Sequence, residues 1–202
     1  MIDFLSTFVV FFAVIDPIGT VPVFIAVTSQ YDEQKKRSFA IKATMVSAAV
    51  LAFFVVAGEP ILTAMDIPLA AFQIAGGIVL FLFALTMIFG DSKPEQELKM
   101  TSGGSDAAVF PLAIPSIASP GAMLAAVLMT ENARYSLWEQ AQTTVTMLAV
   151  LLITFALMLG ASWVHRFIGS SGASVVSRVM GLILASVATA NALAGIKAYF
   201  EL

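Results

Sequence analysis

Two short motifs place a polar side chain directly before a proline inside a long apolar stretch. Asp16 precedes Pro17 in the first stretch, and Ser119 precedes Pro120 in the fourth. Aspartate and serine are favoured N-caps, and proline is favoured at the first helical position, so each motif predicts a helix that starts in mid-stretch. A helix N-terminus offers free amides and partial positive charge, which suit a carboxylate. Asp16 offers the opposite charge, which suits an ammonium group, a proton or a sodium ion.

Residues beside these two helix starts complete a candidate binding site for a small zwitterion. The amides at Gly19, Thr20 and Gly121 would bind its carboxylate, and Asp16 would bind its ammonium group or a coupling ion. A Cβ added at either glycine would then obstruct the ligand. The full candidate set is Asp16, Gly19, Thr20, Ser116, Ser119, Gly121 and Asn191.

The polar side chains of this set also have purely structural interpretations. Asp16 could be only a helix cap, and Ser116 and Ser119 could bond to local backbone. Asn191 lies in the sixth apolar stretch, where it could join two helices by a polar contact. Acidic residues inside a membrane are costly and usually functional, which favours a functional role for Asp16.

The composition indicates that a membrane protein holds these residues in place. Of 202 residues, 59% are hydrophobic and 11% are charged, and the mean hydropathy is +0.96. Soluble domains are about 45–50% apolar and about 25% charged. A soluble protein of this size could not bury so much apolar surface, so the expected partner is the lipid bilayer.

Other classes of function are excluded by what the sequence lacks. A net charge of −3 gives no basic surface for a nucleic acid. The absence of cysteine and the single histidine, His165, argue against a disulfide framework and a histidine-built zinc site. The chain also has no zinc-protease, serine-hydrolase or phosphate-loop motif. We therefore expect no enzyme activity and no cofactor beyond a coupling proton or sodium ion.

Six apolar stretches are long enough to cross a bilayer core of about 30 Å as helices. They cover residues 2–29, 39–58, 69–89, 107–130, 143–167 and 175–200. We predict an all-α polytopic membrane protein with six transmembrane helices. Prolines are predicted to break the first and fourth helices in mid-membrane. These helix-breaking residues are Pro17, Pro22, Pro115 and Pro120.

The two halves of the chain resemble each other at an offset of about 103–105 residues. Asp16-Pro17 falls on Ser119-Pro120, and Thr86 falls on Asn191. This predicts one transmembrane domain made of two three-helix repeats, residues 1–90 and 107–202, joined by a cytoplasmic loop over residues 91–106. Three spans are an odd number, so the second repeat would be inverted relative to the first, as in many secondary transporters.

Basic residues predict the orientation, because cytoplasmic loops are enriched in lysine and arginine. The loops after the first, third and fifth stretches hold eight of the ten basic residues, and Arg134 and Lys197 lie on the other side. Both termini are therefore expected outside. The eight are Lys35, Lys36, Arg37, Lys42, Lys93, Lys99, Arg166 and Arg178.

Several motifs in order resemble those of the MarC family over essentially the whole chain. The first-stretch motif is residues 16–24, DPIGTVPVF, and the second and third stretches contribute AGEPIL at 57–62 and IAGGI at 74–78. The fourth and sixth contribute PLAIP at 111–115 and RVMGLIL at 178–184. Ser119 stands where family members often have glycine, and the region around Asn191 departs from a common pattern with glutamine and aspartate.

The resemblance implies a transporter of small neutral amino acids in the inner (plasma) membrane of a prokaryote. Transport of glycine or alanine would be driven by a proton or sodium gradient, through a pocket between the two broken helices. The chain would also be able to form a homo-oligomer. A channel for small solutes and a non-transporting scaffold or stress protein are the alternatives. Saturable, gradient-coupled uptake would distinguish a carrier from both.

Overall fold

The computed structural model describes residues 4–89, 108–132 and 134–201, and every regular element among them is a helix. The predicted loop over residues 91–106, with Lys93 and Lys99, lies outside the described residues. In chain order the elements are α1 (Phe4–Ile15), α2 (Pro17–Thr28), α3 (Glu33–Ala64), α4 (Leu69–Phe89), η1 (Ala108–Ile117), α6 (Pro120–Leu128), α7 (Leu137–Leu159) and α8 (Ala161–Phe200).

The helices are long and apolar enough to cross a bilayer five times, or six times if one bent pair is a single span. The bent pair is η1 with α6, which meet at an angle of 55°. The pair α1 and α2 already forms one span, Phe4–Thr28. The prediction of an all-helical, multi-spanning membrane protein is thereby confirmed for the described residues.

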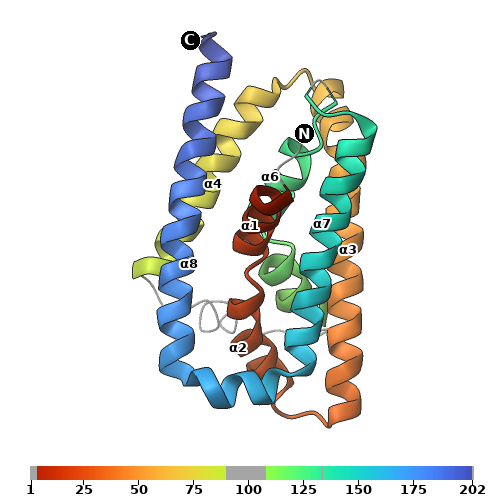
Figure 1. Ribbon diagram of the computed structural model, residues 1–202, viewed down its shortest axis with the longest axis vertical. Coiled ribbons are helices and arrows are strands. Elements are labelled where there is room, and N and C mark those ends of the chain that lie inside the picture. Colours follow the sequence, from red (N-terminus) through yellow and green to blue (C-terminus); the bar gives the residue numbers. More distant parts are fainter. Residues whose placement is uncertain (1–3, 90–107, 133, 202) are drawn as a thin grey trace.

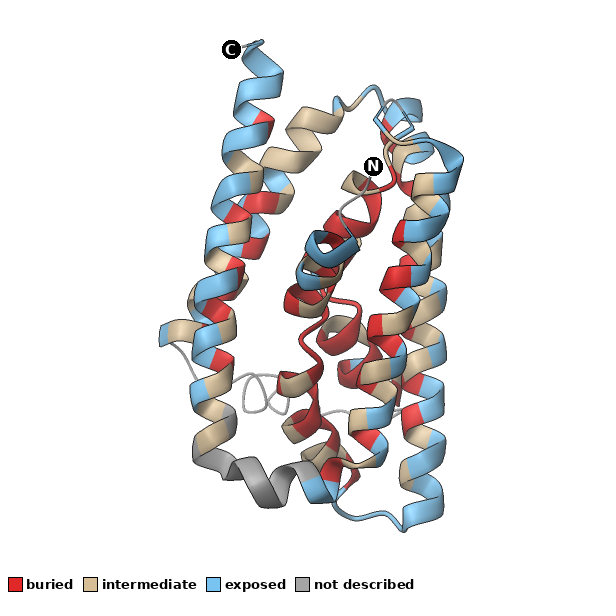
Figure 2. Ribbon diagram, in the orientation of Figure 1, coloured by how far each residue is buried: buried red, intermediate tan, exposed pale blue. Residues whose placement is uncertain are grey.

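The broken helices occupy the centre of the bundle (Figure 1). The pair α4 and α8 packs on one side, and α3 and α7 pack on the other, with α1 and α2 between them. Burial follows this layout, because the buried residues gather on α1, α2, η1 and α6 (Figure 2). In the first span 61% of the most apolar window is buried inside the protein, against 22% in α3 and in α4. The unbroken helices therefore present most of their surface to lipid.

Glycines allow α4 and α8 to approach closely along their length. A Cβ at Gly77 would lie 2.9 Å from the carbonyl oxygen of Ala188, and one at Gly195 would lie 2.9 Å from that of Ala70. Small residues at such contacts let helix backbones pack without a hydrophobic driving force, which lipid does not supply. This closely packed pair lies beside the broken helices.

The helices α3, α7 and α8 each begin before the predicted stretch, and the predicted ends of the second and fifth stretches are wrong. Helix α3 continues past residue 58, the predicted end of the second stretch, through Pro60 to Ala64. A proline near a helix end removes one backbone bond without stopping the helix. Helix α7 ends at Leu159 instead of residue 167. The Gly160 amide donates to the Ala156 carbonyl at 3.0 Å, and a new helix, α8, begins at Ala161. Because the residues on both sides of this turn are apolar, hydropathy alone does not reveal it.

Candidate functional site

The first helix break is a single residue, Asp16, in the left-handed conformation with φ 52°. Helix α1 ends before it and α2 starts after it, at Pro17, where the cap-and-proline motif places the start. Its side chain, only 2% exposed, caps α2 by accepting from the Gly19 amide at 3.0 Å. The Thr20 hydroxyl donates to the Asp16 backbone carbonyl at 3.0 Å. The break thus places a carboxyl group inside the bundle.

Gly19 makes room for that carboxylate. A Cβ at this position would overlap an Asp16 carboxylate oxygen and would lie 2.7 Å from its Cγ. The Gly19 amide is therefore not bare, as the sequence suggested, because the side chain of Asp16, three residues earlier, already accepts its hydrogen bond. The Thr20 amide likewise donates to the Asp16 carbonyl, at 3.1 Å.

The second break is wider than the first. In η1 the backbone is extended at Phe110 and Ile114, each directly before a proline, which agrees with the break predicted at Pro115. Helix α6 then starts at Pro120 with Ser119 as its N-cap. The Ser119 hydroxyl accepts from the Ala122 amide at 3.1 Å and donates to a backbone carbonyl of the other break.

The two breaks meet through hydroxyl groups. Ser119 donates to the Val14 carbonyl of α1 at 2.6 Å, and the hydroxyls of Thr20 and Ser116 lie 3.5 Å apart. These three hydroxyl-bearing residues are at most 1% exposed. A polar region therefore lies where segments about a hundred residues apart cross, surrounded by apolar spans. Four predicted residues, Asp16, Thr20, Ser116 and Ser119, are brought together here.

Sequence reasoning missed Ser47 on α3. Its hydroxyl is fully buried and donates to the Ala43 carbonyl at 2.9 Å and to the Ala113 carbonyl of η1 at 3.2 Å. It satisfies backbone that the prolines of η1 leave irregular, which membrane burial requires. A small polar residue within a lipid-spanning stretch was the available signal.

Three predicted residues have different surroundings. A Cβ at Gly121 would meet the side chain of Leu80 on α4, so this glycine serves packing between α6 and α4. Pro22 lies inside α2 and does not break it. Asn191 is half-buried on α8, between Ala188 and Ala192, which face Gly77 of α4. No contact described for Asn191 joins it to the breaks.

At the end of the bundle where α3 terminates, a carboxylate joins α3 to the loop after α6. One oxygen of Glu59 accepts from the Asn132 backbone amide at 2.8 Å and from its side-chain amide at 2.9 Å. Gln140 of α7 donates to the Asn132 side chain at 3.0 Å. Burial, and then the charge of Glu59, raise the pKa of the neighbouring Glu131 from its ordinary value of 4.5.

At the opposite end, a pocket of about 350 Å³ opens beside the last turn of α2. None of the predicted site residues lines it. Among the described residues, no three histidine, cysteine, aspartate or glutamate side chains could share a metal ion.

Comparison with known proteins places these features in a family. Residues 1–200 match the model of the MarC family integral membrane protein. The UPF0056 membrane protein YvbG of Bacillus subtilis is 34% identical over 199 residues, covering 96% of this chain and 93% of that protein. The UPF0056 inner membrane protein YhgN of Escherichia coli K12 is 29% identical over 201 residues, covering all of both chains. No solved structure matches the chain.

Proposed function

The chain belongs to the MarC family of integral membrane proteins, and we propose that it is a secondary active transporter of small neutral amino acids, of the glycine or alanine class. The observation that carries the proposal is the crossing of two broken helices, joined by Ser119 and Val14, beside the buried Asp16 carboxyl. Broken helices near mid-membrane are the usual binding sites of secondary transporters.

In this proposal Asp16 holds the place of the substrate carboxylate. It occupies the Gly19 amide at the α2 N-terminus, where a free carboxylate would bind. When the substrate arrives, its carboxylate takes that amide and the aspartate turns to the substrate ammonium group. A proton or a sodium ion would neutralise Asp16 in the absence of substrate and would so couple uptake to a gradient. Ser116, Ser119 and Asn191 remain predicted polar contacts.

We also propose that the two three-helix units are inverted repeats. The helix contacts support this, because they occur in matched pairs: α3 packs on η1 as α7 packs on α1, and α6 packs on α3 as α2 packs on α7. Helix α6 also contacts α4 as α2 contacts α8. An exchange of the two units therefore maps each of these contacts onto another, as a two-fold axis in the membrane plane would.

The experiment is uptake of radiolabelled glycine and alanine into liposomes that contain the purified protein. We expect saturable uptake that requires an imposed proton or sodium gradient, with Asp16→Asn as the variant lacking the charge. Unsaturable flux independent of a gradient would indicate a channel. Thermal stability measured against twenty amino acids identifies the ligand, because a bound substrate raises the melting temperature.

We propose an inner-membrane location with both termini outside. Reporter fusions at Leu202 test the orientation, and light scattering in detergent tests the predicted homo-oligomer.

A further inference from the structure

The pocket at the end of α2 lies between four helices and has two kinds of wall. Its volume is about 350 Å³, within the range of small-ligand sites. One wall is apolar and comes from Phe24 and Ile25 of α2 with Met158 and Leu159 of α7. The other is polar and comes from the start of α3, with Glu33, Lys36 and Arg37, and from Ser29 and Ser162.

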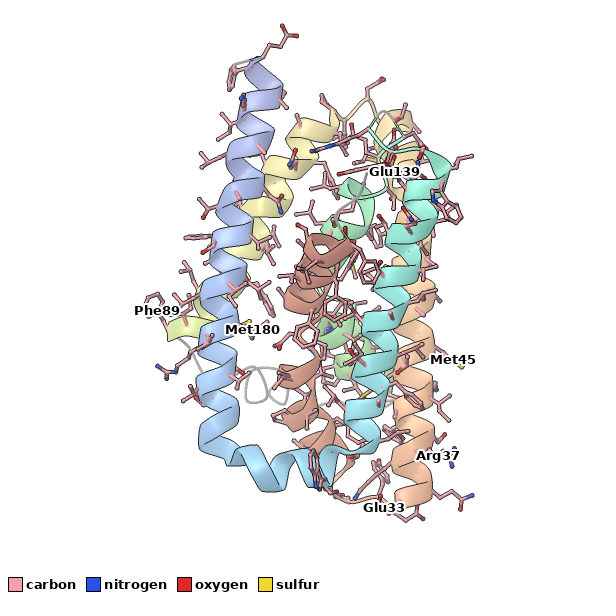
Figure 3. All side chains as sticks on the ribbon, viewed as in Figure 1. Glu33, Arg37, Met45, Phe89, Glu139 and Met180 are labelled. Carbon is pink, nitrogen blue, oxygen red and sulfur yellow. The ribbon has the colours of Figure 1, made fainter. Side chains whose placement is uncertain are left out.

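The basic side chains of the pocket differ in their pairing. Lys36 forms an ion pair with Glu33 at 2.7 Å, and the Glu33 side chain is 83% exposed. No ion pair or hydrogen bond is described for Arg37, which leaves its guanidinium available to a ligand. Figure 3 shows Glu33 and Arg37 at this same end of the bundle. A guanidinium binds phosphate oxygens through paired donors, so the free charge suits a phosphate group.

Aromatic residues indicate that the pocket lies at the depth of the lipid headgroups. Trp163, which follows the pocket residue Ser162, is 67% exposed, and Tyr31, two residues before Glu33, is 40% exposed. The Lys35 ammonium lies over the Tyr31 ring at 5.8 Å. Exposed tryptophan and tyrosine gather at membrane–water interfaces, and lysine and arginine gather on the cytoplasmic side.

We propose that this pocket binds one anionic phospholipid. The headgroup phosphate lies against Arg37, with Lys36 as a second donor, and the first part of an acyl chain lies along Ile25 and Leu159. Basic pockets between transmembrane helices are a known mode of anionic-lipid recognition. A small amino acid would leave the apolar wall unused. The proposal does not depend on transport.

The test measures lipid binding to the purified protein by native mass spectrometry and by melting temperature. We expect phosphatidylglycerol to bind and to raise the melting temperature more than phosphatidylcholine does. Arg37→Gln should weaken phosphatidylglycerol binding about fivefold, which corresponds to about 1 kcal/mol for one basic residue. Glu33→Gln releases Lys36 and should strengthen the binding, at little structural cost because exposed ion pairs contribute little.

Lys42→Gln is the matched control, because Lys42 is an exposed basic residue on α3 that does not line the pocket. Equal losses of phosphatidylglycerol binding in Arg37→Gln and Lys42→Gln would show general attraction to the basic surface and would overturn the site. Inorganic phosphate and glycerol 3-phosphate test whether the pocket binds a free phosphate group. If either raises the melting temperature as much as phosphatidylglycerol does, the proposal of a lipid ligand is overturned. Stabilisation by glycine or alanine that Arg37→Gln abolishes would reassign the pocket to substrate.

Discussion

The two helix breaks have the same arrangement of cap and proline but differ in the chemical group of the capping side chain. Each begins a half-helix with a capping side chain followed by proline. Asp16 caps with a carboxylate, which accepts hydrogen bonds, whereas Ser119 caps with a hydroxyl, which accepts and also donates. Ser119 therefore bonds the Ala122 amide and the Val14 carbonyl together, and so joins the second break to the first.

This difference assigns the two breaks different tasks. The serine break is held by neutral bonds to backbone on both sides, which fixes the crossing without a charge. The aspartate break holds Asp16, the one buried acid among the described residues, in a left-handed conformation that aspartate and asparagine tolerate better than most residues. Stability should therefore depend on Ser119 and gradient coupling on Asp16.

The largest effect is expected for Asp16→Asn. Asparagine keeps the left-handed backbone and a capping oxygen, so the melting temperature should stay close to that of the parent. Gradient-driven uptake should fall at least about tenfold, because the substrate ammonium group loses its charged partner. A hydrogen bond to a charged group contributes about 1.5–3 kcal/mol. Uptake in liposomes at several pH values and sodium concentrations measures this. Parental uptake with the same ion dependence would make Asp16 a structural cap.

The second comparison sets Gly19→Ala against Gly121→Ala. The first Cβ overlaps the Asp16 carboxylate, which must leave the Gly19 amide, whereas the second meets the end of the Leu80 side chain. We expect Gly19→Ala to cost about 1–3 kcal/mol through lost capping and overpacking, and Gly121→Ala to cost less. Thermal unfolding in detergent compares them. The reverse order would show that the carboxylate position is not fixed by the glycine.

A smaller loss is expected for Ser119→Ala, at about 1–2 kcal/mol, since the change removes a cap and leaves the Val14 carbonyl without its donor. Thr154→Val on α7 is the control. Its hydroxyl is equally buried but bonds only to Val150 of its own helix, at 2.9 Å. Equal losses in unfolding stability for the two variants would mean that Ser119 does not join the breaks.

The sequence predicted what depends on local chemistry. Cap-and-proline motifs located the starts of α2 and α6, because capping and proline preferences act within a few residues. Asp16 was predicted to cap α2, but the consequence that its side chain occupies the Gly19 amide was not drawn. Prediction failed where contacts are distant, because the neighbours of Gly121 and Asn191 depend on how α4 packs. The role of Ser47 depends on η1, 66 residues away in the chain.

The loop that follows the second half-helix, α6, is expected to give the smallest change in stability. Glu131 follows α6, and burial and Glu59 raise its pKa, while Arg134 lowers it. A raised pKa means that the folded protein binds this proton more tightly than the unfolded chain does. The resulting stabilisation is present below pH 4.5 and is lost as the pH rises through the raised pKa.

Glu131→Gln should therefore melt at a higher temperature than the parent at pH 7, and the difference should shrink as the pH approaches 4. Arg134→Gln removes the charge that lowers the Glu131 pKa, so the pH range in which protonated Glu131 stabilises the fold should extend to higher pH. A difference between Glu131→Gln and the parent that is constant from pH 4 to 7 would show that the carboxyl is not held in this environment.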